Sequence, residues 1–510
     1  MKSGYWQEVR QVNNRSLTEN GSIGYATSGH ALLDLHFQLS SLRDRDEAYI
    51  AQKFMQAYYE DPEHALKWMF YIRDIREGLG ERRAFRACLS YLADSHPRVA
   101  RGLVELVPEY GRFDDLLPLL ETELKDDVAD FLDRQLTADL TAADRGEDVS
   151  LLGKWLPSDN ASSKQTRVYA AILKRSFGMT GRDYRAALSK LRACIDVTEK
   201  KMSDRRWEEI DYNKVPAKAN LRYDDAFVRN DRAGREKYYC NLISGDDAAK
   251  IAGIQPYEIV HRLIKSAGCY YKLKEDLFAE ILWEKLMGDG YKNDWGLDDC
   301  IVVADGSGSM YRTVPGASAV MAIEVCEALA IYFAGQLKGE LHDKAITFSR
   351  TPQLIDLAPG KGIREKLEIM LAHNEVANTD IEAVFDLLLE TAIKGQLAAE
   401  DMPGQVLIIS DMEFDAARAF NLDDSLFDTI EKKFHDVGYR LPQLIFWNVC
   451  GRTNTIPKIK GDRLRLISGF SQNAAKVACD RKSQDPYEAL IKILDSPRYD
   501  RVCRKNIDTK

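Results

Sequence analysis

The segment Asp305-Gly306-Ser307-Gly308-Ser309 brings three oxygen donors together on a short turn. Asp305 supplies a carboxylate, while Ser307 and Ser309 supply hydroxyls, so all three donors are hard oxygens. The two glycines allow the backbone between them to bend tightly. Hard oxygens suit Mg²⁺, and Ca²⁺ or Mn²⁺ would also fit, whereas no histidine or cysteine is interleaved that would favour zinc or copper. The segment therefore predicts a site for a hard divalent cation.

Two later segments place further oxygen donors next to expected secondary structure. Asn378-Thr379-Asp380 precedes an expected helix, and Ser410-Asp411 follows the apolar run Val406–Ile409. Ligands of an open α/β sheet bind at the carboxyl ends of its strands, where loops from different strands reach one point. We expect Thr379 and Asp411 to complete the shell of the ion.

The order D-x-S-x-S, then Thr, then Asp at a later strand end resembles the metal-ion-dependent adhesion site (MIDAS) of von Willebrand factor A domains. The resemblance implies that the hydroxyls of Ser307, Ser309 and Thr379 bind the ion directly or nearly so. The carboxylates of Asp305 and Asp411 would bind it through water. It also implies an open coordination position that a partner's carboxylate can fill. Gly306 departs from the bulkier residue that is usual after the first aspartate, a change expected to loosen the strand end without removing a ligand.

The same residues do not form a known catalytic motif. Ser307 stands where a phosphotransfer aspartate would want a second acidic residue, and Asp305 occupies the first glycine position of a G-x-S-x-G nucleophile elbow. The segment Gly360-Lys361-Gly362 lacks the frame of a phosphate-binding P-loop. We therefore expect a binding protein and not an enzyme. A metal-dependent nuclease or phosphatase is the third alternative, but these donors offer it no general base.

Short β-rich runs alternate with helical stretches after Trp295. The expected strands are Cys300–Ala304, Ala345–Phe348, Val406–Ile409, Leu444–Val449 and Leu464–Ile467. The expected helices are Ala317–Leu337, Gly362–Leu371, Ile381–Ile393 and Asp424–His435. This alternation favours a Rossmann-like domain with a mainly parallel central sheet, the architecture of a von Willebrand A domain.

The first half of the chain has the periodicity of helices. From about Asp44 to Met287, apolar residues recur every three or four positions, and breaks such as His96-Pro97 divide them into helix-length segments. Helical pairs resembling HEAT repeats would fit, and an irregular bundle is the alternative, because no clean repeat period is present. The fold class is therefore α plus α/β. The predicted domains are a Gly-rich segment, 1–43, that packs on the helical domain, 44–290, followed by the A domain with C-terminal helices, 291–510.

Several segments of the first half, taken as an ordered set, resemble known families. Asn20–Gly29, Arg73–Arg82 and Tyr110–Leu116 resemble the TROVE module of Ro-type RNA-binding proteins. Trp155–Lys164, Tyr184-Arg185, Leu188–Arg192 and Val215–Ala219 are similar to domain of unknown function 2828, a family that joins such a region to a von Willebrand A domain. The likeness covers nearly the whole chain. It implies a helical-repeat ring that holds single-stranded RNA ends and small structured RNAs, with the A domain closing the ring.

A basic tract with aromatic neighbours supports RNA binding, because cations engage phosphates and rings stack on bases. The candidate residues are Lys164, Arg167, Lys174, Arg175, Arg182, Arg185, Lys190 and Arg192, with Tyr169, Tyr184 and Trp207 nearby. The alternative is an amphipathic helix pair with a solvated cationic face. A second charged cluster, Arg73, Asp74, Arg76, Glu81 and Arg82, predicts an ion-pair network around the turn at Gly78 and Gly80. Its alternative is that these arginines line the hole of the ring.

Bulk properties set the remaining limits. The chain has 510 residues, of which 45% are hydrophobic, so two or three domains are expected. A formal net charge of -9 excludes a uniformly basic nucleic-acid coat. The nine cysteines occur singly, which predicts reduced thiols, and no apolar run approaches the roughly 20 residues that span a bilayer. We expect a soluble, cytoplasmic protein without a membrane or dinucleotide partner.

Two functions follow from these features. The leading hypothesis is a ribonucleoprotein-like binding protein, in which the helical domain binds single-stranded or small structured RNA and the A domain holds Mg²⁺ for an acidic protein ligand. The second hypothesis is an adaptor for protein assembly, for example with a AAA-type ATPase, that works through the MIDAS without RNA.

Overall fold

The chain forms two compact units in this computed structural model, and each unit is discontinuous in sequence. The sheet unit comprises Met1–Ala65 and Ile254–Asp495, and the helical unit comprises Leu66–Gly253 and Ser496–Lys510. The structure describes residues 14–244, 253–267, 273, 275–290, 296–297, 299–315, 319–348, 351–374, 380–415, 426–453, 455–457, 464–477 and 485–504. The expected division was into contiguous ranges, 1–43, 44–290 and 291–510.

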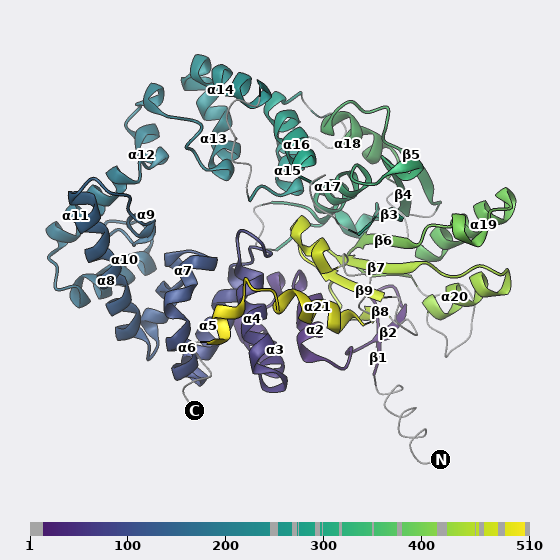
Figure 1. Cartoon of the computed structure of the whole chain (residues 1–510), viewed down its shortest axis with the longest axis horizontal. Coiled ribbons are helices and arrows are strands. Elements are labelled where there is room, and N and C mark those ends of the chain that lie inside the picture. Colours follow the sequence, from purple (N-terminus) through teal and green to yellow (C-terminus); the bar gives the residue numbers. More distant parts are fainter. Residues whose placement is uncertain are drawn as a thin grey trace, which may run out of the picture. The chain divides into compact units, whose positions relative to one another are not determined.

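The sheet unit is built around six strands in the order β5-β4-β3-β6-β7-β9 (Figure 1). Its strands are β3 (Cys300–Asp305), β4 (Lys344–Phe348), β5 (Gln353–Asp356), β6 (Gln405–Ser410), β7 (Gln443–Asn448) and β9 (Leu464–Ser468). All neighbouring pairs are parallel except β4 and β5. Every residue of β3, β6 and β9 is buried, as expected of parallel strands covered on both faces.

The predicted strands and helices of the second half are confirmed. The helices observed there are α17 (Ala322–Ala334), α18 (Ile363–Ala372), α19 (Ile381–Gly395), α20 (Leu426–Asp436) and α21 (Pro486–Leu494). Strand β5 was missed, because Gln353-Leu-Ile-Asp356 is short and half polar, as suits an antiparallel edge strand. Every residue of α17 is buried, and this helix packs against β3, β4 and β6. Helix α17 therefore forms part of the core behind the ends of those strands.

Two helices that we expected in the helical domain cluster with the sheet. These are α15 (Pro256–Ala267) and α16 (Leu277–Gly290), which pack on α17 and α18. These helices pack there because they bury apolar side chains: Ile259, Val260 and Leu263 of α15 are completely buried. Periodicity identifies such a helix but does not say which apolar surface it covers.

The N-terminal segment also forms its hydrogen bonds with the sheet unit, although we expected it to pack on the helical domain. Strands β1 (Arg15–Leu17) and β2 (Ile23–Tyr25) form a hairpin, and β2 pairs with β8 (Ile456–Pro457). A Cβ at Gly24 would lie 2.4 Å from the carbonyl oxygen of Ile456, so the close pairing requires glycine. The same unit holds α2 (Ala31–Phe37) and α3 (Glu47–Glu60), while α4 (Pro62–Arg73) crosses the boundary between the units.

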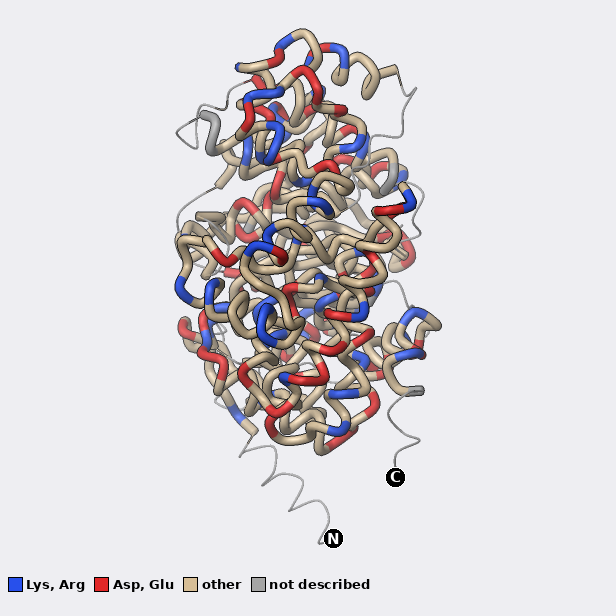
Figure 2. Tube along the Cα trace, turned by 90° about the vertical axis from the view of Figure 1, so that its left-hand side faces the viewer, with Lys and Arg blue, Asp and Glu red and all other residues tan. Residues whose placement is uncertain are grey.

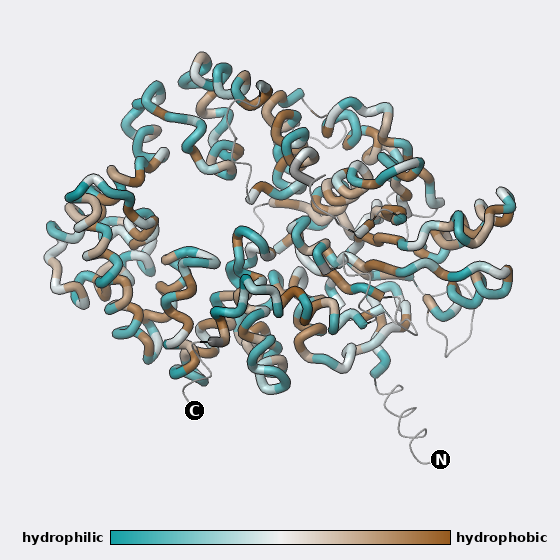
Figure 3. The backbone as a smooth tube through the Cα atoms, in the orientation of Figure 1, coloured by the Kyte–Doolittle hydropathy of each residue, from teal (hydrophilic) through white to brown (hydrophobic). Residues whose placement is uncertain are grey.

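The helical unit consists of short helices with buried apolar faces, visible as the brown stretches of its tube in Figure 3. Its helices are α5 (Arg83–Ser95), α6 (Pro97–Leu103), α7 (Val107–Tyr110), α8 (Lys125–Asp144), α9 (Leu152–Trp155), α10 (Lys164–Ser176), α11 (Gly181–Cys194), α12 (Thr198–Ser203), α13 (Ala217–Asn230), α14 (Arg232–Ser244) and α22 (Asp500–Arg504). Ser163 and Thr180 cap α10 and α11 by accepting backbone hydrogen bonds. Within the described part of the chain, none of the helices combines the length and apolarity that a bilayer crossing needs.

A buried ion-pair network holds the first helices of this unit together. The fully buried carboxylate of Asp115 accepts hydrogen bonds from Arg73 at 2.8 Å and from Arg86 at 2.8 Å. Burial by itself would raise the pKa of Asp115, but the two guanidinium groups outweigh it and hold the pKa below its usual range. A Cβ at Gly111 would lie 2.6 Å from this carboxylate, so glycine is required there. Of the predicted cluster, Arg73 and Arg82 pair with Asp115 and Asp114, and Asp74 pairs with Arg498, so each of these ion pairs has a partner outside the predicted set.

Removal of Arg73 tests the contribution of this network. Arg73→Met should lower the free energy of unfolding by about 3 kcal/mol, because it leaves part of a buried carboxylate without compensation. The matched control is Arg101→Met, since Arg101 is 54% exposed in its pair with Asp127 and should cost less than about 1 kcal/mol. Urea denaturation of the full chain, followed by circular dichroism, measures both. Equal losses for the two variants would contradict the predicted difference.

Candidate metal centre

Asp305 ends strand β3 at the carboxyl edge of the sheet and is fully buried. Its Oδ1 accepts a hydrogen bond from the backbone N–H of Ser307 at 2.9 Å. Its Oδ2 accepts a hydrogen bond from the hydroxyl of Ser410 at 2.6 Å. Both oxygens are therefore held in place, one by the turn that follows β3 and the other by the end of β6.

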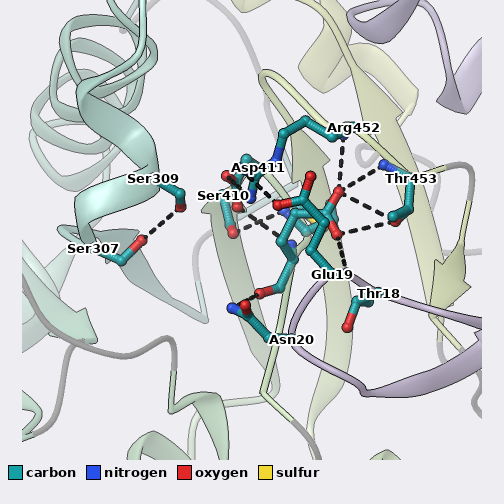
Figure 4. A network of polar contacts seen from close by, with 12 residues as sticks. Thr18, Glu19, Asn20, Ser307, Ser309, Ser410, Asp411, Arg452 and Thr453 are labelled. Carbon is teal, nitrogen blue, oxygen red and sulfur yellow. Dashed lines mark hydrogen bonds and ion pairs between the residues drawn. The ribbon is translucent and has the colours of Figure 1, made fainter.

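The two serines lie on the turn that leaves β3. Ser307 precedes the 3₁₀ turn Gly308–Tyr311, and Met310 anchors this turn by burying its side chain completely. The hydroxyl oxygens of Ser307 and Ser309 are 3.1 Å apart, and Figure 4 shows the Ser309 hydroxyl on the side that faces Asp411. The i, i+2 spacing thus places two hydroxyls next to each other, as the sequence predicted.

Asp411 reaches the same edge because β6 lies beside β3. The parallel register pairs Ala304 with Ile409, so the residues that follow each strand emerge together. Asp411 is 1% exposed, and its Oδ1 accepts a hydrogen bond from the backbone N–H of Glu413 at 3.3 Å. Its Oδ2 lies 3.4 Å from Nη2 of Arg452. Asp305, Ser307, Ser309 and Asp411 are thus brought together from two neighbouring strand ends.

The electrostatics of this edge are dominated by two buried carboxylates. Burial and the nearby charge of Asp411 raise the pKa of Asp305 to about 7, against the effect of its hydrogen bonds from Ser410 and Ser307. Burial also raises the pKa of Asp411, while a hydrogen bond with Ser309 and the charge of Arg452 act in the opposite direction. Each carboxylate therefore resists ionisation unless positive charge compensates it.

A third acidic residue, Glu413, ties the N-terminal segment to this edge through Glu19, Arg452 and Thr453, which Figure 4 labels. Its buried carboxylate accepts hydrogen bonds from the backbone N–H groups of Glu19 at 2.8 Å, Arg452 at 2.9 Å and Thr453 at 2.7 Å. Arg452 then bridges two carboxylates, since its Nη1 lies 2.8 Å from Glu19. We missed Glu413, Arg452 and Glu19 because they come from three distant segments with no shared motif.

The backbone between Asp411 and Glu413 adopts an uncommon conformation. Met412 has a φ of 64°, in the left-handed region that non-glycine residues rarely occupy. Its N–H donates to the hydroxyl of Ser410 at 3.0 Å, which helps to hold this conformation. Such strain costs on the order of 1–3 kcal/mol and is kept where the surroundings enforce it. The turn directs Asp411 toward Ser309 and Glu413 toward the N-terminal segment.

The donor set fits a hard divalent cation. The four residues offer two carboxylates and two hydroxyls, all oxygen donors, in a buried position where uncompensated charge is costly. Thr379, the fifth predicted ligand, lies outside the described residues. In the part of the chain that the structure describes, no three His, Cys, Asp or Glu side chains gather as a metal-binding group. Chemically, the arrangement can hold a cation through hydroxyls and water, with few direct charges.

The structure shows most cations of the predicted RNA-binding tract in contacts within the helical unit. Arg192 donates to the carbonyl oxygens of Gly153 and Leu156, which fixes the loop after α9. The other contacts join a side chain to a neighbouring loop or helix: Lys174 and Arg185 to Asp159, Lys190 to Asp144, and Arg167 to the carbonyl oxygens of Ala161 and Ser162. Only Lys164, Arg175 and Arg182 are exposed without a hydrogen-bond or ion-pair partner among the described residues. Tyr184 is fully buried and is therefore not available for base stacking.

Comparison with known proteins assigns most of the chain to two family models. Residues 18–127 and 174–289 match the family described as Domain of unknown function (DUF2828), which confirms the predicted resemblance. Residues 299–505 match the family described as Domain of unknown function (DUF7788).

Two individual proteins are similar over most of their length. The chain is 28% identical over 523 residues to "Uncharacterized protein L728" of Acanthamoeba polyphaga mimivirus, with 94% of this chain and 87% of the relative covered. It is also similar to the crystal structure of the RO (RSR) protein of Deinococcus radiodurans. That match has 12% sequence identity and a TM-score of 0.40, and it covers 86% of this chain and 92% of the other.

The raised pKa of Asp305 predicts a pH dependence of stability. Its unfolded value is about 4, so between about pH 4 and pH 7 the folded chain binds more protons than the unfolded chain. In the presence of a chelator, the free energy of unfolding should therefore decrease as the pH rises through this window. Asp305→Asn should reduce this slope, and urea denaturation at several pH values measures it. A slope that is the same in wild type and variant would contradict this account.

Proposed function

We propose that this chain, with its DUF2828 and DUF7788 regions, is a non-enzymatic binding protein that holds a divalent cation at the β3–β6 edge and uses it to bind a carboxylate of an acidic partner. The observation that supports this proposal is the convergence of Asp305, Ser307, Ser309 and Asp411 from two strand ends. Mg²⁺ suits this donor set best, because it prefers hard oxygens and keeps several of its waters.

The ion supplies a positive, electrophilic centre that a carboxylate can bind. In this proposal the hydroxyls of Ser307 and Ser309 hold the ion, while Asp305 and Asp411 orient water around it. Few direct negative charges on the ion leave it attractive to a further carboxylate. Such a contact would be directional and dependent on the metal, which suits recognition of a specific acidic side chain in a partner protein.

A hydrolytic role is less well supported by the same geometry. Both oxygens of Asp305 accept hydrogen bonds, from Ser307 and Ser410. Both oxygens of Asp411 are also engaged, by Glu413 and Arg452. A general base must take a proton from substrate or water, and the hydrogen bonds from Ser410 and Ser307 lower the basicity of Asp305. Recognition therefore accounts for the site better than catalysis does.

Metal binding is tested by the stability that the ion adds. At about 100 times its dissociation constant, Mg²⁺ should raise the free energy of unfolding of the wild type by about 2.7 kcal/mol. Ser309→Ala and Asp411→Asn should lose most of this increment. The matched control is Asp343→Asn, because Asp343 is buried in the same unit but pairs with Lys366 at 2.7 Å. This variant should keep the full Mg²⁺ response even if its baseline stability is lower.

Carboxylate recognition needs a separate measurement. The wild type should be retained on immobilised poly-L-glutamate in Mg²⁺ and released by EDTA, whereas poly-L-glutamine should not retain it. Ser309→Ala should abolish this retention. Retention that persists in EDTA, or that Ser309→Ala leaves unchanged, would disprove the proposed use of the ion.

RNA binding by the helical unit is a second candidate function. Its support is the set of three exposed cations on α10 and α11 that have no partner among the described residues, Lys164, Arg175 and Arg182. Long cations that form no internal ion pair are free to contact phosphates. Figure 2 shows basic and acidic positions interspersed along the trace, so any contact with RNA would be local. Without such binding, the protein would act as an adaptor through its cation alone.

The salt dependence of RNA binding separates these two functions. Each phosphate contact with single-stranded RNA contributes about 0.7 to the slope of log affinity against log salt. Replacement of Lys164, Arg175 and Arg182 by Ala should therefore reduce this slope by about 2 in a filter-binding titration. The control variant replaces Arg101, Arg134 and Lys214 by Ala. These substitutions remove the same total charge, but from cations that already form ion pairs. Equal effects of both triple variants, or no binding by the wild type, would favour the adaptor.

A further inference from the structure

The buried carboxylate of Glu327, on helix α17, has no ion-pair partner among the residues that the structure describes. Glu327 lies on α17, is 1% exposed, and is held by a single hydrogen bond, from Nδ2 of Asn374 to its Oε1 at 2.6 Å. Its Oε2 is buried, and no group among the described residues donates a hydrogen bond to it. A buried, ionised carboxylate in this state destabilises the fold unless it binds a proton or a cation.

The side-chain amide of Asn374 also has a buried oxygen that accepts no hydrogen bond from the described residues. Asn374 follows α18, and its Oδ1 is buried without a hydrogen-bond donor in the described part of the chain. This oxygen lies close to the β3 edge, because a Cβ built on Gly306 would be 2.5 Å from it. The absence of a side chain at Gly306 thus has a steric reason that the sequence did not indicate. It makes room for the Asn374 side chain beside Asp305.

A second buried carboxylate on the same helix, Glu324, has a side-chain partner of a kind that Glu327 lacks among the described residues. Glu324 is also 1% exposed, but its Oε2 lies 2.6 Å from Nδ1 of His261 on α15. Helix α17 thus carries two buried acids one turn apart: Glu324 contacts His261, whereas the contact of Glu327 within the described part of the chain is with the amide of Asn374. The two unpartnered oxygens, Glu327 Oε2 and Asn374 Oδ1, are the acceptor types that Mg²⁺, Mn²⁺ and Ca²⁺ bind.

We propose that Glu327 and Asn374 bind a second divalent cation next to Asp305, through the carboxylate oxygen and the amide oxygen that have no hydrogen-bond donor. This position goes beyond the partner-binding site, because the two sets of donors share no residue. The first set comes from the turn after β3 and the end of β6, and the second comes from α17 and the end of α18. A cation there would compensate Glu327 and would lie close enough to Asp305 to reduce the repulsion among the buried acids.

Counting bound Mn²⁺ tests this proposal on the full chain. Electron paramagnetic resonance of free Mn²⁺ during a titration should give two bound ions for the wild type and one for Glu327→Gln. Gln has the shape of a protonated glutamate, so this variant also tests whether a proton alone satisfies the site. Asn374→Ala, at a half-buried position, should weaken the second ion at least tenfold and serves as an independent variant if Glu327→Gln folds poorly. Glu324→Gln is the matched control and should keep both ions.

The outcomes also separate this proposal from the partner-binding site. If the wild type binds one ion, and Ser309→Ala removes this ion while Glu327→Gln does not, the second site is disproved and the first is supported. One ion that Glu327→Gln removes and Ser309→Ala leaves unchanged would support the Glu327 site and disprove the first. No bound Mn²⁺ in the wild type, or one ion that both variants remove, would overturn a separate second site.

Discussion

The repulsion between two buried carboxylates, Asp305 and Asp411, is the constraint around which the sheet edge is organised. They come from neighbouring parallel strands in register, so the fold forces them together at the ends of β3 and β6. Burial raises the pKa of both groups, and the charge of Asp411 raises the pKa of Asp305 further. Hydrogen bonds from Ser307, Ser410 and the backbone of Glu413, together with the guanidinium of Arg452, offset part of this cost. A hard cation would offset more of it, because it would favour the ionised form of both groups at once.

The surroundings of this pair are arranged to hold the oxygens in place without neutralising them completely. The hydroxyl of Ser410 bridges from Asp305 to the backbone of Met412, so that the two strand ends are linked by one side chain. Arg452 supplies the only guanidinium that the described residues bring to Asp411, and it is shared with Glu19 of the N-terminal segment. The edge thus keeps a deficit of positive charge, which is the property that a binding site for a metal ion needs.

The helical unit uses its charges differently. The buried carboxylate of Asp115 forms ion pairs with Arg73 and Arg86. Most cations of the α10–α11 tract bind nearby carboxylates or carbonyl oxygens. These contacts stabilise loops and helix ends, so they are not available to a ligand. A count of basic residues therefore overstates the surface that could contact RNA. The exposed, unpaired subset is what distinguishes a binding tract from a solvated helix pair.

The local features could be predicted from the residue pattern alone: the alternation of strands and helices after Trp295, the helical first half, and the spacing of Asp305, Ser307 and Ser309 on one turn. These follow from side-chain periodicity and backbone preferences, which act over a few residues. The approach of Asp411 could also be predicted, because parallel strands end at one edge.

Which distant groups share a charge environment depends on the packing of the folded chain. This packing places α15 and α16 with the sheet, brings Glu19 and Arg452 to the β3–β6 edge, and puts Asn374 in the space that Gly306 leaves. The packing also leaves Glu327 without an ion-pair partner among the described residues, whereas Glu324 contacts the imidazole of His261. Burial and compensation are sums over neighbours far apart in the chain, and a local pattern of residue types does not contain them.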